Sequence, residues 1–127
     1  MAAFLPDERG AADRETLIVV AIDGAVVPAH WPLEIGQALL SAERRKRISR
    51  EDRQQVLDEL EFLPIAIDLE TSTQAWHQTL VLADAQALSL YDAAYLELAI
   101  RRGLPLATRD KSLGAAAERC GVPRRPM

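Results

Sequence analysis

The segment from Leu88 to Asp110, LSLYDAAYLELAIRRGLPLATRD, constrains the fold of this chain more than any other stretch. Ser89 is a suitable N-cap residue, and Gly103 predicts the end of a helix that starts there. We therefore predict a helix over about 90–102. The apolar residues at 104–108 are too few for a second helix and predict a short buried strand. Asp110 follows this strand.

The first acid of this segment, Asp92, lies on the apolar side of the predicted helix. Helical spacing places it beside Tyr95 and Leu96, whereas Glu97 and Arg101 lie on the opposite side. A carboxylate among apolar residues needs a cation or hydrogen-bond donors to offset its burial. A purely structural role also stays open, because an acid in the first turn caps a helix and complements its dipole.

Two further acids are expected at the same edge of a parallel sheet. Asp110 directly follows the predicted strand at 104–108, and ligands of parallel α/β sheets bind at the carboxyl ends of strands. Glu34 falls in the first turn of a helix that follows a predicted strand at 25–28. The helix that carries Asp92 would run antiparallel to the strands and so begin at this edge. Carboxylates gathered in this way repel one another unless a metal ion lies between them.

The segment from Thr16 to Pro28 allows two interpretations. Asp23-Gly24 between β-branched runs is typical of a hairpin, yet the same residues fit a helix that ends at the glycine. We favour a helix to about Ile22 and then the strand. The remaining predicted elements are a helix capped by Ser49, a strand at 64–69, a helix from Thr71 or Ser72 through Leu88, a short helix at 112–119 and an edge strand at 121–123. The first 15 residues predict no strand.

Length and composition predict a single domain over residues 1–127. The chain weighs 14.0 kDa and is 49% hydrophobic, which is enough for one core. No apolar run approaches the roughly 18 residues of a membrane span, and Cys120 is the only cysteine, so we expect a reducing cytoplasm. The formal net charge of −4 argues against nonspecific attraction to nucleic acid. A local basic run remains, consisting of Arg44, Arg45, Lys46 and Arg47.

Several polar residues carry weaker signals. The basic run is more typical of a solvated helix end than of a phosphate contact. Asp68 follows a predicted strand, but no neighbouring residue type supports a site there. His30 and His77 lack a second histidine at metal-binding spacing.

Three segments together resemble a PIN-domain ribonuclease of the VapC toxin type: GAVVPAHWPLEIGQALL, LSLYDAAYLELA and LPLATRDKSL. The FLPDE opening and the LPIAID strand extend the resemblance over nearly the whole chain. It implies a three-layer α/β/α sandwich with a central parallel sheet. It also implies that Glu34, Asp92 and Asp110 belong to a four-acid cluster that binds Mg²⁺ or Mn²⁺ and hydrolyses RNA, with the Thr108 hydroxyl beside the last acid. Arg109 and the basic run would position RNA phosphates. Expected partners are a VapB-like antitoxin and a second copy of the chain.

One departure from the family pattern concerns the start of the chain. Family members begin with a central strand ending in aspartate, whereas this chain resembles the residues after that strand, so we expect the first strand and its aspartate to be missing. Asp7 does not replace the aspartate, and Asp23 stands at the wrong place in the order of elements. We therefore expect a start codon assigned too far downstream or a truncated chain, with weakened metal binding. A catalytically inactive module that binds RNA or an antitoxin is the main alternative, and a receiver-type phosphoacceptor domain ranks far behind.

Overall fold

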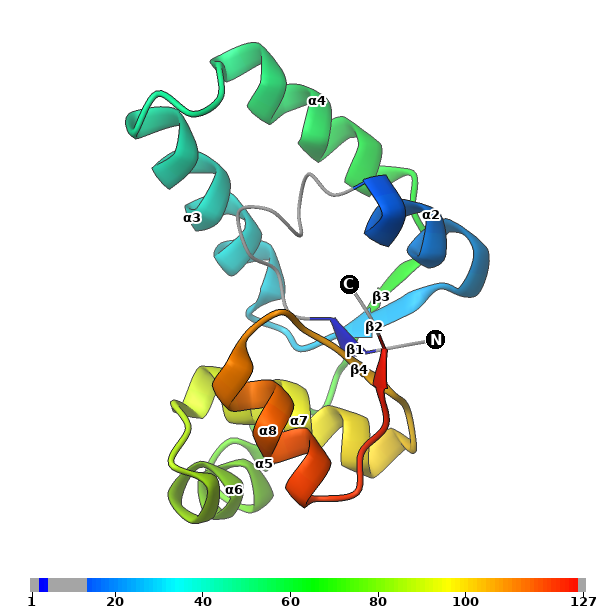
Figure 1. The fold of residues 1–127 in the computed structure, drawn as a ribbon, viewed down its shortest axis with the longest axis vertical. Coiled ribbons are helices and arrows are strands. Elements are labelled where there is room, and N and C mark those ends of the chain that lie inside the picture. Colours follow the sequence, from blue (N-terminus) through cyan, green and yellow to red (C-terminus); the bar gives the residue numbers. More distant parts are fainter. Residues whose placement is uncertain (1–2, 5–13, 126–127) are drawn as a thin grey trace.

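The structure is a computed structural model that describes residues 3–4 and 14–125 (Figure 1). Its strands are β1 Ala3–Phe4, β2 Ala25–Val27, β3 Ile65–Ile67, β4 Leu106–Ala107 and β5 Arg124–Arg125. Its helices are α2 Arg14–Asp23, α3 Trp31–Arg44, α4 Arg50–Glu61, α5 Thr71–Gln74, α6 Gln78–Gln86, α7 Leu90–Arg102 and α8 Lys111–Arg119. Within these ranges, no helix has the length and apolar character needed to cross a bilayer.

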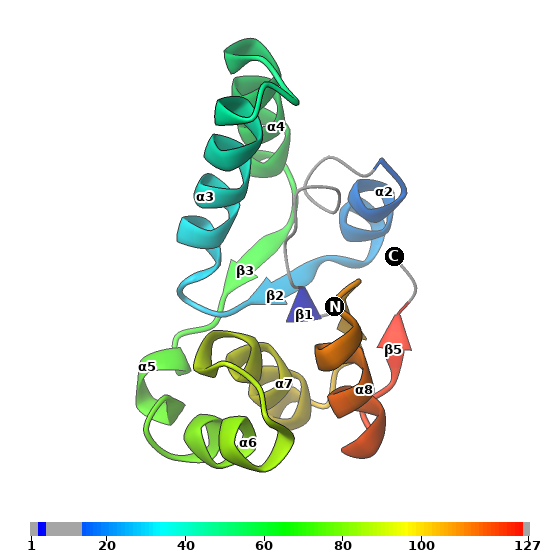
Figure 2. The same ribbon diagram turned by 60° about the vertical axis from the view of Figure 1, so that its left-hand side comes forward.

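The strands form one parallel sheet in the order β3-β2-β1-β4-β5. Helices α2, α3 and α4 lie on one face of the sheet, and α5 to α8 lie on the other (Figures 1 and 2). Right-handed crossovers explain this division, because the chain moves outward from β1 to β3 and then returns past β1 to β4 and β5. The predicted three-layer α/β/α sandwich is confirmed.

The central position of the sheet is filled, so the expectation that the first strand is missing was wrong. Ala3 pairs with Val26 of β2 and with Leu106 of β4, which places β1 between them. The physical reason is that the facing edges of β2 and β4 carry backbone donors and acceptors that need partners. The expectations for residues 5–13, including Asp7, lie outside the described residues.

The core is built around α7, which packs beneath β1 and β4. Tyr95, Leu96 and Leu98 of this helix are almost completely buried, and they meet Val26 of β2 and Leu106 of β4 in one hydrophobic cluster. Because the same helix begins with Asp92, the core also fixes the position of that acid.

The helix-then-strand interpretation of residues 16–28 is confirmed, and the hairpin is excluded. Gly24 has a φ of 73° and links α2 directly to β2. A left-handed conformation at this point favours glycine, since it ends the helix without steric cost.

Two boundaries differ from the sequence prediction. The helix expected from Thr71 to Leu88 is broken into α5 and α6, because His77, at φ −117° and ψ −106°, leaves the helical conformation and turns the chain so that α6 packs along α7. The last strand is β5 rather than 121–123. Val122 instead donates its N–H to Ala117 O at 2.8 Å, which satisfies a carbonyl at the end of α8.

Two glycines should respond oppositely to the same substitution. Gly103 ends α7 with a φ of 64°, whereas Gly36 lies inside α3, and at both positions an added Cβ meets no atom within 4 Å. We expect Gly103→Ala to lower the free energy of unfolding by about 1 kcal/mol and Gly36→Ala to raise it by up to about 1 kcal/mol. Urea denaturation followed by circular dichroism measures both, and changes of the same sign would contradict the prediction.

Candidate functional site

The structure brings Glu34, Asp92 and Asp110 to the same edge of the sheet. Glu34 lies in the first turn of α3, which follows β2, and Asp110 is the N-cap of α8, which follows β4. Asp92 lies in the first turn of α7. Burial raises the pKa of Asp92, and repulsion from Asp110 and then Glu34 raises it further. The three carboxylates are therefore close enough to act on one another electrostatically, at the edge where parallel sheets bind ligands.

The acids in the first turns of α4 and α7 are bonded differently, and the difference shows that Asp92 does more than cap its helix. In α4, Ser49 accepts from the Asp52 N–H and Asp52 accepts in return from the Ser49 N–H, both at 3.0 Å, so the capping box is complete. In α7, Ser89 accepts from the Asp92 N–H at 3.1 Å, and no return bond from the Ser89 N–H is present among the described residues. The half-buried Asp92 carboxylate therefore does not close the box, and capping alone does not explain it.

Asp110 is held by its neighbours through both backbone and side chain. Its N–H donates to Thr108 Oγ1 at 3.0 Å, and its Oδ1 accepts from the Leu113 N–H at 2.8 Å. Thr108 is buried, so its hydroxyl fixes the backbone from which Asp110 projects. Asp110 caps α8 with Oδ1, and Oδ2 of its exposed side chain accepts no hydrogen bond from the residues that the structure describes.

Glu34 is held by two residues that the sequence did not single out for this purpose. The Tyr95 hydroxyl donates to Glu34 Oε1 at 2.6 Å, and His30 Nε2 lies 3.2 Å from the same oxygen. Burial alone would raise the pKa of Glu34, but these two hydrogen bonds hold it below its usual value. The available sequence signals were the four-residue spacing of His30 and Glu34 and the three-residue spacing of Asp92 and Tyr95.

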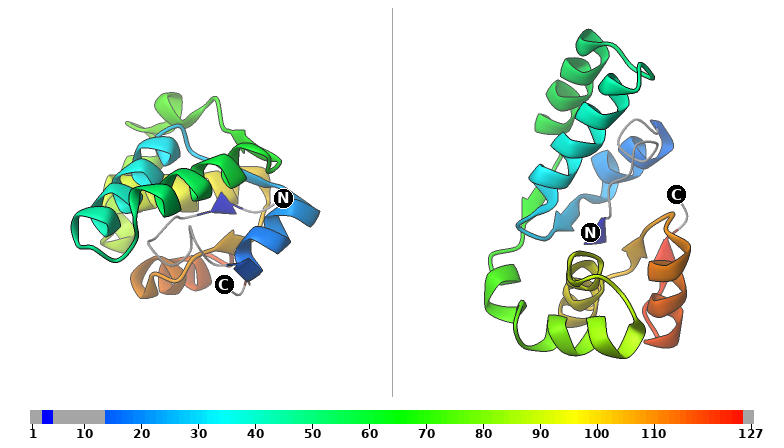
Figure 3. Two further views of the ribbon diagram at one scale, coloured as in Figure 1. Left: turned by 90° about the horizontal axis from the view of Figure 1, so that it is seen from above. Right: turned by 90° about the vertical axis from the view of Figure 1, so that its left-hand side faces the viewer.

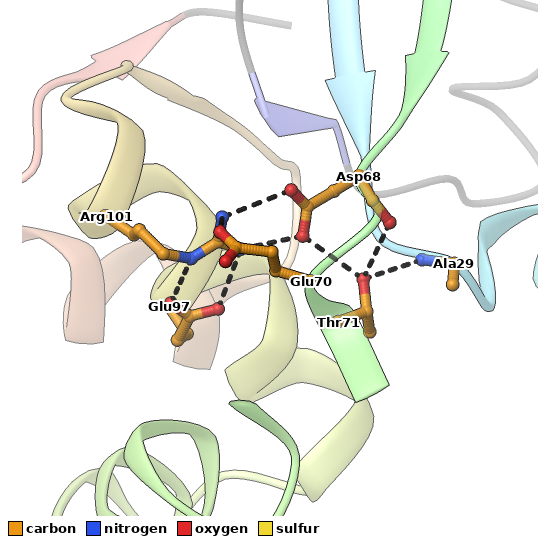
Figure 4. A network of polar contacts seen from close by, with 6 residues as sticks. All are labelled: Ala29, Asp68, Glu70, Thr71, Glu97 and Arg101. Atoms are coloured by element: carbon orange, nitrogen blue, oxygen red, sulfur yellow. Dashed lines mark hydrogen bonds and ion pairs between the residues drawn. The ribbon is translucent and has the colours of Figure 1, made fainter. Parts of the chain in front are cut away.

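Asp68 belongs to a separate network around Arg101 (Figure 4). The guanidinium of Arg101 donates to Asp68 Oδ2 at 2.7 Å, to Glu97 Oε2 at 2.7 Å and to Glu70 Oε2 at 3.0 Å. Asp68 and Glu97 are both buried. Glu97 lies on the side of α7 away from Asp92, as its spacing predicts, and its burial is tolerable because Arg101 neutralises it. Asp68 is therefore committed to Arg101.

This network also reaches the loop that precedes α3. Thr71 Oγ1 lies 3.4 Å from Asp68 Oδ2 and accepts from the Ala29 N–H at 2.9 Å (Figure 4). Because Ala29 adjoins His30, the Arg101 network supports the start of the helix that carries Glu34.

Asp23, Arg109 and the basic run at 44–47 differ in how close they lie to the three acids. Asp23 pairs with Arg125 at the opposite edge of the sheet, since it precedes β2, and so does not join the three acids. Arg109 directly precedes Asp110. The exposed basic run lies at the α3–α4 turn, the far tip of a helical hairpin that projects from the sheet (Figure 3). Arg44 is ten residues beyond Glu34, roughly 15 Å along the helix axis.

The donor chemistry of the site suits a hard divalent cation, because carboxylate oxygens are the preferred ligands of Mg²⁺ and Mn²⁺. The mutual repulsion at Asp92 is the kind of unbalanced charge that such an ion would offset. Within the described ranges, however, no group of three His, Cys, Asp or Glu side chains lies close enough to hold one ion together. An ion held here would thus depend on the Asp92 and Asp110 pair and on water.

The fold and this edge of carboxylates agree with a comparison to known families. The family model described as PIN domain matches residues 1–119. The chain belongs to the PIN-domain family. PIN domains are generally metal-dependent nucleases, which agrees with acids at the carboxyl ends of the strands.

Among solved structures, the PIN-domain chain is similar to the crystal structure of PAE2754 from Pyrobaculum aerophilum. The identity is 21% and the TM-score 0.69, over 91% of this chain and 86% of that chain. A likeness at this identity shows the fold alone. A comparison with curated proteins gives no match.

Proposed function

We propose that this PIN domain is a metal-dependent endoribonuclease that acts as the VapC-type toxin of a toxin–antitoxin pair in the cytoplasm. The observation that carries the proposal is the placement of Glu34, Asp92 and Asp110 at three helix starts along one edge of the parallel sheet. The raised pKa of Asp92, caused by burial and then by the two neighbouring carboxylates, supports it. Carboxylates gathered at the ligand-binding edge of a parallel sheet favour a cation site.

The mechanism assigns a role to each acid. Asp92 and Asp110 would hold Mg²⁺ or Mn²⁺, with Thr108 fixing the backbone of Asp110. The ion supplies charge stabilisation at the scissile phosphate and a more acidic water. Glu34 either holds a second ion or aligns the attacking water. Arg109 adjoins the site and would position a nearby phosphate.

The basic run of Arg44, Arg45, Lys46 and Arg47 would contact RNA further along the strand. Its distance from Glu34 fits a phosphate other than the scissile one. This assignment predicts a salt-dependent contribution to RNA affinity rather than to the chemical step.

A protein partner is part of the proposal. Leu69, Trp76 and Val81 are exposed by 92%, 83% and 60%, and exposed apolar side chains in one segment of a chain are typical of a contact surface. A VapB-like antitoxin and a second copy of the chain are the proposed occupants of such surfaces. Copurification from the native operon followed by light scattering would detect either; a lone monomer with no partner would reject this part of the proposal.

Metal-dependent RNA cleavage tests the function directly. We expect the purified protein to cleave labelled single-stranded RNA in Mg²⁺ or Mn²⁺, and EDTA to abolish cleavage until excess Mn²⁺ restores it. A rate that EDTA does not change would reject the mechanism, because the carboxylates alone offer no substitute for the charge of the ion.

A catalytically inactive PIN module that binds RNA or an antitoxin is the second candidate. The observation that favours it is the lack, in the described part of the chain, of three side chains able to hold one ion together. Calorimetry distinguishes the two candidates: Mn²⁺ binding that requires Asp92 supports the nuclease, and RNA binding without any Mn²⁺ binding supports the inactive module.

A further inference from the structure

The Glu34 carboxylate is bound asymmetrically. Tyr95 and His30 both meet the same oxygen, Oε1, at 2.6 Å and 3.2 Å. Oε2 accepts no hydrogen bond from any described residue. One oxygen is therefore fixed by the protein, and the other remains for a ligand.

The polarity of these two contacts is set by their surroundings. His30 Nε2 lies 3.2 Å from the Tyr91 carbonyl oxygen as well as 3.2 Å from Glu34 Oε1. Both neighbours are acceptors, so Nε2 carries the proton. Burial and then Glu34 raise the pKa of Tyr95 far above its usual value, so its hydroxyl stays protonated and donates.

The two donors also lock α3 against α7. Tyr95 is completely buried in the core, and the His30 ring packs edge-on against it at a centroid distance of 5.4 Å. Glu34 thus takes its position from the helix that also carries Asp92.

Hydrogen bonds to Oε1 leave Oε2 able to bind either an ion or a water molecule, so the position of Glu34 relative to the other acids decides between the two. Within the described ranges, Glu34 does not form a group of three ligands with Asp92 and Asp110.

We propose that Tyr95 is a positioning residue that, with His30, fixes Glu34 Oε1 so that Oε2 orients the attacking water and does not bind the metal. This inference rests on the proposed nuclease function and decides between the two roles left open for Glu34. In the hydrolysis, the water oxygen bonds to phosphorus, one P–O ester bond breaks, and the water proton ends on the leaving oxygen. Glu34 accepts a hydrogen bond from that water and is not consumed.

Three variants test the inference, with unbound Mn²⁺ measured by electron paramagnetic resonance and RNA cleavage measured separately. We expect Glu34→Gln to bind Mn²⁺ within about twofold of the wild type and to lose about 100-fold in kcat, because water alignment is lost. We expect Tyr95→Phe to lose about tenfold in kcat, as for one hydrogen bond to a charged group, with KM and Mn²⁺ affinity unchanged. Thr79→Val removes another buried hydroxyl, in α6, and should change neither quantity.

Two results would overturn the inference: Mn²⁺ binding weakened more than tenfold in Glu34→Gln, which would mean that Glu34 supports metal binding as a ligand or as an outer-shell partner, or an unchanged kcat in a folded Tyr95→Phe. If Tyr95→Phe does not fold, Glu34→Gln alone decides. A wild-type protein that neither binds Mn²⁺ nor cleaves RNA would instead overturn the proposed function and this inference with it, and that outcome is visible before any variant is made.

Discussion

Asp92→Asn should abolish RNA cleavage and at the same time stabilise the metal-free protein. The carboxylate is half-buried and faces Asp110 and Glu34, and burial and these neighbours raise its pKa. Its ionised form is therefore unfavourable in the folded state, and the neutral amide removes that cost. Activity should fall by at least about 100-fold, the scale for losing one group that stabilises charge in the transition state. Thermal melts and RNA cleavage assays measure the two effects.

The pH dependence of this stabilisation has a definite sign. The pKa of Asp92 in the folded state lies above the usual 3.8. The contribution of Asp92 to the free energy of unfolding is therefore largest below pH 3.8, and it is lost as the pH rises through the folded-state pKa. The advantage of Asp92→Asn over the wild type should thus grow as the pH rises across that interval and then stay constant. Taking the difference between the two proteins cancels the opposite trend of Asp68, whose pKa is lowered and which belongs to the separate Arg101 network.

Mn²⁺ and a matched substitution complete this test. Mn²⁺ should raise the melting temperature of the wild type but not of Asp92→Asn, because binding to the folded state alone stabilises it. Asp84→Asn changes an exposed acid on α6 and should alter neither activity nor the response to Mn²⁺. An Asp92→Asn protein that keeps full activity would remove Asp92 from the mechanism.

The sequence predicted the positions of Glu34, Asp92 and Asp110 at one edge of the sheet because local signals placed the helix starts that carry them. Helix α7 begins after Ser89 and ends at Gly103, as predicted. Helices α3 and α8 begin shortly after β2 and β4 end. In a parallel sheet these local facts are enough to bring helix starts to one edge. The hydrogen bonds from His30 and Tyr95 to Glu34 were not predictable in this way. Glu34 and Tyr95 are 61 residues apart, and their contact depends on how two helices pack.

The central strand and the Arg101 network escaped prediction for a related reason. The two residues of β1 are too few to show a periodic pattern. They form a strand because the facing edges of β2 and β4 need backbone hydrogen-bond partners. Asp68 and Arg101, 33 residues apart, meet because the fold brings the residue that follows β3 beside the last turn of α7. Sequence spacing placed Arg101 on the right face of its helix but carried no information about the acids across from it.

Arg101→Met should be the most destabilising single substitution considered for this protein. The guanidinium contacts Asp68 and Glu97, whose side chains are each only 6% exposed. Methionine keeps much of the apolar stem but leaves two buried carboxylates without their cation. Removal of one partner from a buried ion pair costs about 3 kcal/mol or more, which is a large share of the stability of a small domain. Urea denaturation should show a lower midpoint with a similar slope.

The matched variant is Arg102→Met, which removes an exposed arginine from the same last turn of α7. It should cost only a few tenths of a kcal/mol through the helix dipole. A loss in Arg101→Met no larger than this would show that the network contributes little.

Neutralising the acids should recover part of the stability that Arg101→Met loses. Burial would raise the pKa of Asp68, and Arg101 holds it below its usual value by hydrogen bonding and charge. Without Arg101, only the hydrogen bonds from the Glu70 backbone and the Thr71 side chain still oppose the effect of burial on this pKa. Asp68 should therefore take up a proton at a higher pH, and the destabilisation should shrink as the pH falls. Adding Asp68→Asn and Glu97→Gln should reproduce that recovery at neutral pH, because the unpaired charges are then absent. A triple variant as unstable as Arg101→Met would mean that the loss comes from packing of the arginine stem rather than from charge.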